Sequence, residues 1–298
     1  MADTQLEVRE QAPSRPAGPS QPTQRVDRVT VIKPAPRWPH LDLRELWHFR
    51  ELAGALTWRD VAVRYKQTSI GVAWAILQPF LTMVVFTFVF GRFANLPSNN
   101  VPYPIFSYSA LLPWTFFASA VALAAGSLVA NRGLVTKVYF PRILLPLAGT
   151  TVPIVDFMLA LTVLFGMMAW FDVWPSFAIV LAPLFMLMAF VTALGVSLFL
   201  SAVNARYRDV PYAIPFVLQI WLYLSGVVGA ISAFPVKWQW VLALNPMTTV
   251  IVGFQWGFLG TAAPDLAKSL IGVAATLTFF VVGLWYFRRS EPRFADTI

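Results

Sequence analysis

Few side chains in this sequence could support catalysis, and they do not form any recognisable catalytic motif. The chain has no cysteine, which excludes thiolate zinc sites and thiol nucleophiles. Its only histidines, His40 and His48, precede every long apolar run, so a serine nucleophile inside those runs would lack a histidine base. No Gly-x-Ser-x-Gly elbow occurs, and no lysine lies in the Gly-x-x-x-x-Gly-Lys context that cradles phosphates. We therefore expect a non-catalytic chain without a cofactor, and any ATP that drives it must be bound by a partner.

Asp156 is the only acidic residue inside a long apolar run. A carboxyl group in that setting is costly and is often functional. The alternative is a structural role, in which the carboxyl group is hydrogen-bonded to neighbouring helices, for example through Thr150 or Thr151. A single acid supplies neither a proton relay nor the clustered carboxylates of a metal-dependent transferase, so no metal site is predicted.

The composition identifies the solvent that surrounds the chain. Of 298 residues, 58 % are apolar and only 12 % are charged, and the mean hydropathy is +0.65. A soluble domain carries about 25 % charged residues, so a soluble globular protein is excluded. The net charge of +8 could suggest nucleic acid. However, 11 of the 22 Lys and Arg residues lie before residue 71, and the others lie in short clusters between the apolar runs. This distribution is typical of loops beside membrane spans, so no nucleic-acid partner is expected.

Six apolar runs are long enough, or nearly so, to cross a bilayer, which takes about 20 residues. Barrel strands would alternate in hydropathy over about ten residues, and that alternation is absent. The sequence therefore predicts an all-α membrane protein with six transmembrane helices. The runs are Gly71–Phe90, Ile105–Ala130, Ile143–Phe171, Phe177–Val203, Tyr212–Ile231 and Leu270–Phe287.

A seventh apolar segment, Trp238–Leu259, is interrupted by Asn245-Pro246. Proline lacks an N–H donor and disfavours a helical conformation in the residue before it. Each piece is too short to span, so the segment is predicted to be a broken re-entrant hairpin before the last helix.

Loop charge predicts the orientation. With six spans, every Lys and Arg except Arg92, Lys237 and Lys268 falls on the side of the N-terminus. Positive loops stay in the cytoplasm, so both termini are expected there, in a multi-pass protein of the cytoplasmic membrane.

The chain before the first span has two parts. Residues 1–39 are rich in Pro, Ser, Gln and Arg, contain no signal-peptide apolar stretch and are predicted to be a disordered cytoplasmic tail. Asp42 and Glu45 form a capping box that starts an amphipathic interfacial helix over 40–58. Residues 59–298 form the membrane domain. The apolar face of the helix consists of Leu46, Phe49, Leu52, Ala53 and Leu56.

Several short motifs occur in order along this topology, and together they resemble the membrane subunit of ABC transporters that export lipid-linked polysaccharides. Those substrates are O-antigens, teichoic acids, capsules and galactans, and the resemblance covers about residues 40–298. The motifs are Arg59-Asp60, RYKQTSIGVAWAILQP (64–79), LVTKVYFPRILLPLA (134–148), NARYRDV (204–210) with Pro215, Gln219 and Tyr223, Asn245-Pro246-Met247, and YFRRSEPRFAD (286–296).

The resemblance implies a homodimer of this chain with two copies of an ATPase subunit that binds the ATP. It also implies that the loop 131–142 is a coupling helix seated in a groove of the ATPase, and that Arg206, Arg208 and Asp209 lie in a second loop nearby. The alternatives are a loop whose charges only set the topology and a local Arg–Asp brace. The candidate contacts in the first loop are Lys137, Tyr139, Phe140, Pro141 and Arg142.

The glycan is expected to pass along the dimer interface, where aromatic side chains can stack on sugar rings. The candidates are Trp74, Phe80, Trp221 and Tyr223, for which ordinary packing is the alternative. Two other functions remain open: a permease for a drug or lipid, and a membrane enzyme that acts on a lipid-linked glycan.

Overall fold

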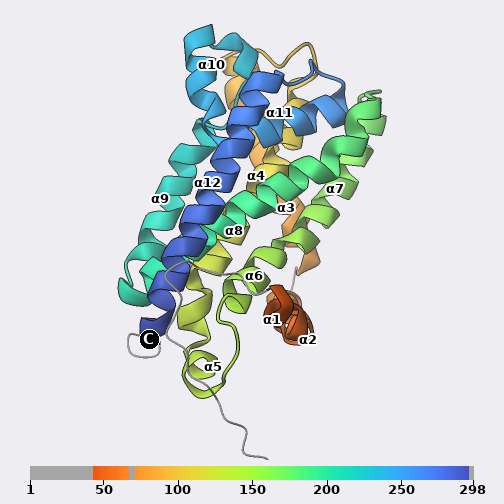
Figure 1. The fold of residues 1–298 in the computed structure, drawn as a ribbon. Coiled ribbons are helices and arrows are strands. Elements are labelled where there is room, and N and C mark those ends of the chain that lie inside the picture. The colour runs from red at the N-terminus through yellow and green to blue at the C-terminus, as the bar shows by residue number, and fades with distance from the viewer. Residues whose placement is uncertain (1–42, 67–70, 295–298) are drawn as a thin grey trace, which may run out of the picture. The chain divides into compact units, whose positions relative to one another are not determined.

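The computed structural model describes residues 43–66 and 71–294, and within these ranges every regular element is a helix (Figure 1). The predicted all-α membrane class is confirmed. The predicted tail 1–39, His40, the N-cap Asp42 and Asp296 lie outside the described residues.

Five continuous helical stretches are long and apolar enough to cross a membrane, and they correspond to five of the six predicted spans. The first is α3 (Val72–Phe86), which continues as a π-helical turn, η1 (Thr87–Phe93). The second is α4 (Tyr103–Ala130). The third combines α6 (Leu144–Thr151) and α7 (Pro153–Trp170), and the fourth combines η2 (Phe177–Leu181) and α8 (Ala182–Arg206). The last is α12 (Leu266–Ser290) with η4 (Glu291–Arg293).

The predicted span Tyr212–Ile231 is only partly helical. Helix α9 (Val210–Tyr223) has 14 residues, which corresponds to about 21 Å at 1.5 Å per residue and falls short of the roughly 30 Å hydrocarbon core. After Tyr223 the chain turns and continues as a non-helical stretch in which Ser225, Val227 and Ala230 are buried. A short turn, η3 (Ile231–Ala233), follows.

The predicted break at Asn245-Pro246 is confirmed. Helices α10 (Val236–Ala243) and α11 (Pro246–Leu259) meet there at an angle of 106°. The chain shortly before α10 and the end of α11 are both bonded to loops at one end of the bundle. The Ala230 amide donates to the Pro97 carbonyl at 3.1 Å, and the Ser176 amide donates to the Gly257 carbonyl at 3.1 Å. The segment therefore enters and returns at the same end, as a re-entrant hairpin does.

Both polar atoms of the Asn245 side chain form hydrogen bonds that stabilise the break between α10 and α11. Its Oδ1 accepts from the Trp221 indole at 2.8 Å and from the Met247 amide at 3.0 Å, and so caps α11. Its Nδ2 donates to the Leu224 carbonyl at 3.0 Å and to Ser225 Oγ at 2.9 Å. One amide therefore satisfies backbone groups at the end of α9 and at the start of α11, where lipid could not.

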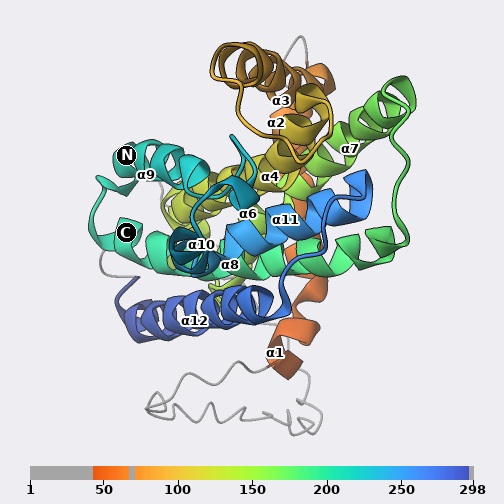
Figure 2. The same ribbon diagram turned by 90° about the horizontal axis from the view of Figure 1, so that it is seen from above.

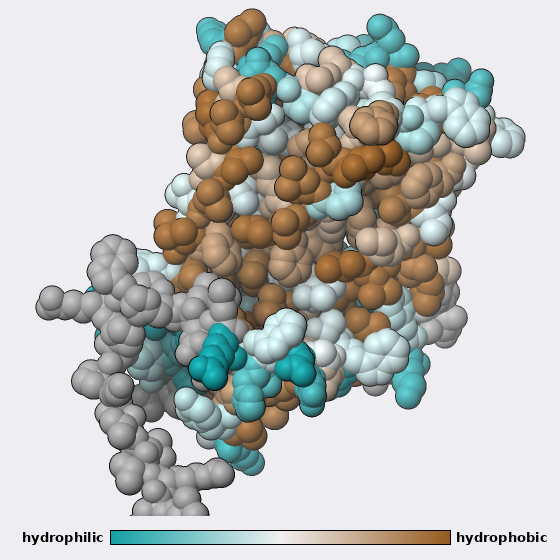
Figure 3. Space-filling view, turned by 45° about the vertical axis from the view of Figure 1, so that its right-hand side comes forward, coloured by the Kyte–Doolittle hydropathy of each residue, from teal (hydrophilic) through white to brown (hydrophobic). Residues whose placement is uncertain are grey.

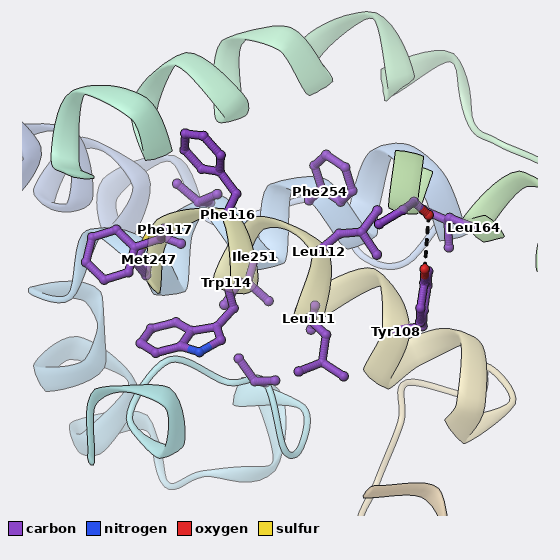
Figure 4. Packing of buried hydrophobic residues seen from close by; sticks show 14 of the residues in the cluster. Tyr108, Leu111, Leu112, Trp114, Phe116, Phe117, Leu164, Met247, Ile251 and Phe254 are labelled. Carbon is purple, nitrogen blue, oxygen red and sulfur yellow. Dashed lines mark hydrogen bonds between the residues drawn. The ribbon is translucent and has the colours of Figure 1, made fainter. Parts of the chain in front are cut away.

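Helix α4 is the centre of the main apolar core. It packs against α8, α7, α11, α3 and α9, and Figure 2 shows it between α3 on one side and α8 and α12 on the other. Phe116, Phe117 and Leu112 of α4 meet Leu164 of α7 and Phe254 of α11 in this core (Figure 4). The buried Tyr108 hydroxyl of α4 donates to the Ala160 carbonyl of α7 at 3.0 Å, the dashed line in that view.

Helices α8 and α12 approach each other closely at two glycines. A Cβ atom on Gly283 would lie 2.0 Å from the Gly195 carbonyl oxygen, and a Cβ on Gly195 would lie 2.6 Å from the Phe280 backbone. The obstacles are backbone atoms, which cannot turn aside, so both positions require glycine. This contact between small residues is typical of helix pairs in membranes.

A second core lies at the opposite end of the bundle from the hairpin, and we call that end the α5 end after α5 (Arg132–Lys137). Short α1 (Leu43–His48) and α2 (Arg50–Lys66) pack there, with α2 against α6. The apolar face predicted for the N-terminal helix packs against this core, and the helix continues past Trp58 to Lys66. Figure 3 shows hydrophobic side chains across the middle of one face and hydrophilic ones towards both ends, as a bilayer requires.

Candidate functional site

The predicted coupling loop contains a short helix followed by a non-helical segment. Helix α5 ends at Lys137, and Val138 adopts an extended conformation. Lys137 and Tyr139 are exposed, and the Tyr139 side chain is 88 % accessible. Val135 is buried and fixes α5 to the core of the α5 end. The loop therefore exposes one basic and one aromatic side chain, while Val135 anchors it to the core.

The next three candidate residues do not share this exposure. The Phe140 side chain is 6 % accessible and packs in the core of the α5 end, and Pro141 is buried. Arg142 Nη1 donates to the Glu291 carbonyl at 2.6 Å, which connects the loop to the turn after α12. Of the five residues predicted from the sequence, only Lys137 and Tyr139 are fully presented to a partner.

The second predicted loop follows α8. Arg206, Arg208 and Asp209 are all exposed, and the Arg206 guanidinium lies 5.1 Å from the centre of the Tyr207 ring. In the part of the chain that the structure describes, neither arginine forms an ion pair with Asp209, so the alternative of a local Arg–Asp brace is wrong. Asp209 instead starts α9, where its carbonyl accepts from the Tyr212 amide at 3.1 Å.

Helix α2 is bonded to the start of α5. Arg59 Nη2 donates to Asn131 Oδ1 at 2.8 Å, and Asn131 is the N-cap residue of α5. The same guanidinium binds Asp60 at 2.7 Å, which fixes its orientation. The motif Arg59-Asp60 had no predicted role in the sequence analysis. In the structure it joins the interfacial helix to the predicted coupling helix.

Asp156 connects α2 to α7. Its Oδ2 lies 2.7 Å from Arg64 Nη2, and its Oδ1 accepts a hydrogen bond from the Tyr65 hydroxyl. Burial, and then the hydrogen bond to this carboxylate, raise the pKa of the Tyr65 phenol above its usual value. The expected bonds through threonine are wrong, because Thr150 and Thr151 donate to carbonyls in their own helix, those of Pro146 and Leu147.

The aromatic candidates lie on two helices that both flank α4. Trp74 and Phe80 belong to α3, and both are exposed, as is Tyr223 on α9. Trp221 is different, because it packs on Phe117 and bonds to Asn245, which is the packing role that was the alternative. Within one chain the exposed aromatic side chains of α3 and α9 form two separate surfaces. Within residues 43–66 and 71–294, no group of three or more acidic or histidine side chains could hold a metal ion.

Comparison with known proteins gives consistent matches over most of the chain. The model of the family described as "ABC-2 type transporter" matches residues 51–259. The O-antigen export system permease protein RfbA of Myxococcus xanthus is 30 % identical over 263 residues, which cover 86 % of this chain and 98 % of that protein. An RfbA of Klebsiella pneumoniae is 27 % identical over 85 % of this chain and 97 % of its own length. The capsule polysaccharide export inner-membrane protein CtrC of Neisseria meningitidis is 27 % identical over 79 % of this chain and 89 % of its own length.

Proposed function

Because the chain belongs to the ABC-2 type transporter family, we propose that it is the permease subunit of an ABC transporter that exports a lipid-linked polysaccharide across the cytoplasmic membrane. The observation that carries the proposal is the coverage of its relatives. Proteins named as O-antigen export permeases match this chain over 97–98 % of their own lengths. Their names favour a polysaccharide over a drug or a lipid as the cargo, and they favour a transport subunit over an enzyme.

The α5 end is the surface that we assign to the ATPase partner. Tyr139 projects from it beside the basic Lys137, and Arg206, Arg208 and Asp209 add charged, exposed positions. Motion received at α5 can reach the third span through α2, because Arg59 binds Asn131 at one end of the path and Arg64 binds Asp156 at the other. On this proposal the α5 end faces the cytoplasm, together with both termini.

A second copy of the chain is the proposed partner of the α3 and α9 surfaces. Phe80 on α3 and Phe216 and Tyr223 on α9 are exposed on either side of the central helix α4. In a homodimer these two surfaces of each copy would meet those of the other and enclose a path with aromatic walls. Sugar rings have apolar faces that can slide over such walls, whereas fixed hydrogen-bonding sites would hold individual units.

The test uses a strain in which the gene is deleted and then restored on a plasmid. We expect surface polysaccharide to disappear on deletion and to return with the intact chain. A tagged chain should co-purify with an ATPase subunit and with a second, differently tagged copy. Normal surface polysaccharide in the deletion strain would refute the proposed cargo, and purification as a monomer without an ATPase would refute the proposed assembly.

A further inference from the structure

A cavity lies beside the predicted glycan path, where the end of α2 meets α3, α4 and α7. Its volume is about 490 Å³, within the range of about 300–1,000 Å³ that is usual for small-molecule sites. It is separate from the re-entrant hairpin and from the α5 projection. The side chains that matter for its chemistry are Arg64, Trp74, Gln78, Thr115, Ser119 and Asp156.

The polar side chains of this cavity have unused hydrogen-bonding capacity. Among the residues that the structure describes, the exposed side-chain amide of Gln78 and the half-buried hydroxyl of Ser119 have no hydrogen-bond partner in the protein. Each carboxylate oxygen of Asp156 accepts one bond, although it has two lone pairs. Gln78 and Ser119 also lie within candidate membrane spans, where an unsatisfied polar group is costly. These groups indicate a polar occupant.

The remaining residues that line the cavity are mostly apolar. Phe116 and Phe157 are buried and line the cavity, while the Trp74 side chain is 52 % accessible. A ligand with an apolar face and a polar edge would match both kinds of wall. A large aromatic ring covers apolar surface, the Gln78 amide can donate and accept hydrogen bonds, and the Asp156 carboxylate can accept them.

The charge of the cavity separates the possible ligands. Arg64 and Asp156 form an ion pair at 2.7 Å, so the positive charge is already balanced and a phosphate group would meet a carboxylate. A hydrocarbon chain would leave the Gln78 amide and the Ser119 hydroxyl without partners and would not use the remaining lone pairs of Asp156. A neutral pyranose ring has several hydroxyl groups around an apolar face and satisfies all of these groups at once.

We propose that this cavity is a binding subsite for one sugar unit of the exported glycan, with Trp74 against the ring face and Gln78, Ser119 and Asp156 bonded to hydroxyl groups. This inference rests on the proposed function. It differs from the sliding path because a side pocket with fixed polar groups can select one kind of sugar, such as the unit nearest the lipid, while the rest of the chain passes.

The experiment exploits the absence of cysteine in the natural chain. Gln78→Cys and Ser119→Cys each place one thiol in the cavity, and Leu123→Cys places one on an exposed position of α4, one turn after Ser119 and outside the cavity lining. The complex of this chain with its ATPase, in lipid nanodiscs, is treated with N-ethylmaleimide. The probes are the lipid-linked polysaccharide extracted from the source strain and polyprenyl phosphate without sugar.

We expect the glycolipid to slow labelling of the two cavity thiols at least fivefold and to leave the Leu123→Cys thiol unchanged. Polyprenyl phosphate should protect none of them. Equal protection by polyprenyl phosphate would identify a lipid site and overturn the proposal, and so would the absence of protection by either probe.

A second measurement compares two exposed aromatic residues of the first span in cells. Trp74→Leu should reduce surface polysaccharide more strongly per inserted molecule than Phe88→Leu, because Phe88 does not line the cavity. Equal loss would count against the subsite. Failure of the unmodified chain to restore export would instead refute the proposed function, so the two failures are distinguishable.

Discussion

Truncation of Tyr139 and truncation of the adjacent Phe140 should affect different properties of the permease. The first should weaken binding of the ATPase, and the second should destabilise the fold. Tyr139 is 88 % accessible, so Tyr139→Ala should change the stability of the permease by no more than about 0.5 kcal/mol. If Tyr139 is an anchor of the ATPase interface, its loss should cost about 2 kcal/mol of binding free energy, which weakens the affinity about 30-fold. Phe140 is 6 % accessible, and Phe140→Ala should destabilise the fold by about 3–5 kcal/mol.

The assay measures three quantities on the same preparations: inserted permease, thermal unfolding in detergent and the amount of ATPase that co-purifies. Tyr139→Ala should retain insertion and the melting temperature but lose the ATPase and export. Phe140→Ala should lose folded permease, and the ATPase should fall only in proportion. Trp170→Ala, an exposed aromatic residue at the far end of α7, is the matched control and should change nothing. Full ATPase recovery with Tyr139→Ala would refute the assignment of the α5 surface.

Three further predictions concern the fold. Gly195→Ala should lower the yield of folded protein, because its Cβ would meet the Phe280 backbone at 2.6 Å, whereas Gly166→Ala, with nothing within 4 Å, should not; equal yields would contradict the close crossing of α8 and α12. Asn245→Ala should cost about 1–3 kcal/mol for each buried group that it leaves unpaired, and a melting temperature equal to that of the unmodified protein would argue against its bridging role. The raised pKa of Tyr65 means that the folded state favours the neutral phenol, so stability is intact below about pH 10 and declines above it; Tyr65→Phe should weaken this alkaline decline in melting temperature, and an unchanged decline would exclude Tyr65 as its source.

The parts of the fold that followed from the sequence are those with a local physical signal. The long spans follow from apolar length, and the hairpin follows from Asn245-Pro246, since proline cannot continue the hydrogen-bonding pattern. The early end of α9 is harder to see, because Leu224–Ala230 is as apolar as the helix before it and conceals the local stop signal Ser225-Gly226, where Gly226 has a positive φ of 79°. Asn245, distant in sequence, also supplies a donor to the Leu224 carbonyl at this end.

In the candidate site, too, some features followed from local sequence and others depend on tertiary contacts. The motif order identified the α5 loop, but sequence could not distinguish Tyr139 from Phe140. The chain bends at Val138 and Phe140, and only the packed core decides which of the two adjacent aromatic side chains is buried. The partners of Asp156 were missed because Tyr65 lies 91 residues away and reaches α7 only through the docking of α2.

Asn245 is also protected from deamidation, the most common spontaneous chemical modification of asparagine. Deamidation usually begins when the backbone nitrogen of the following residue attacks the side-chain carbonyl and closes a cyclic imide with loss of ammonia. The nitrogen of Pro246 carries no hydrogen and is already bonded to three carbons, so this ring cannot form. Conversion to aspartate would remove both N–H donors and bring a negative charge against the Leu224 carbonyl oxygen. The proline that breaks the helix therefore also preserves, over the lifetime of the protein, the amide that holds the break together.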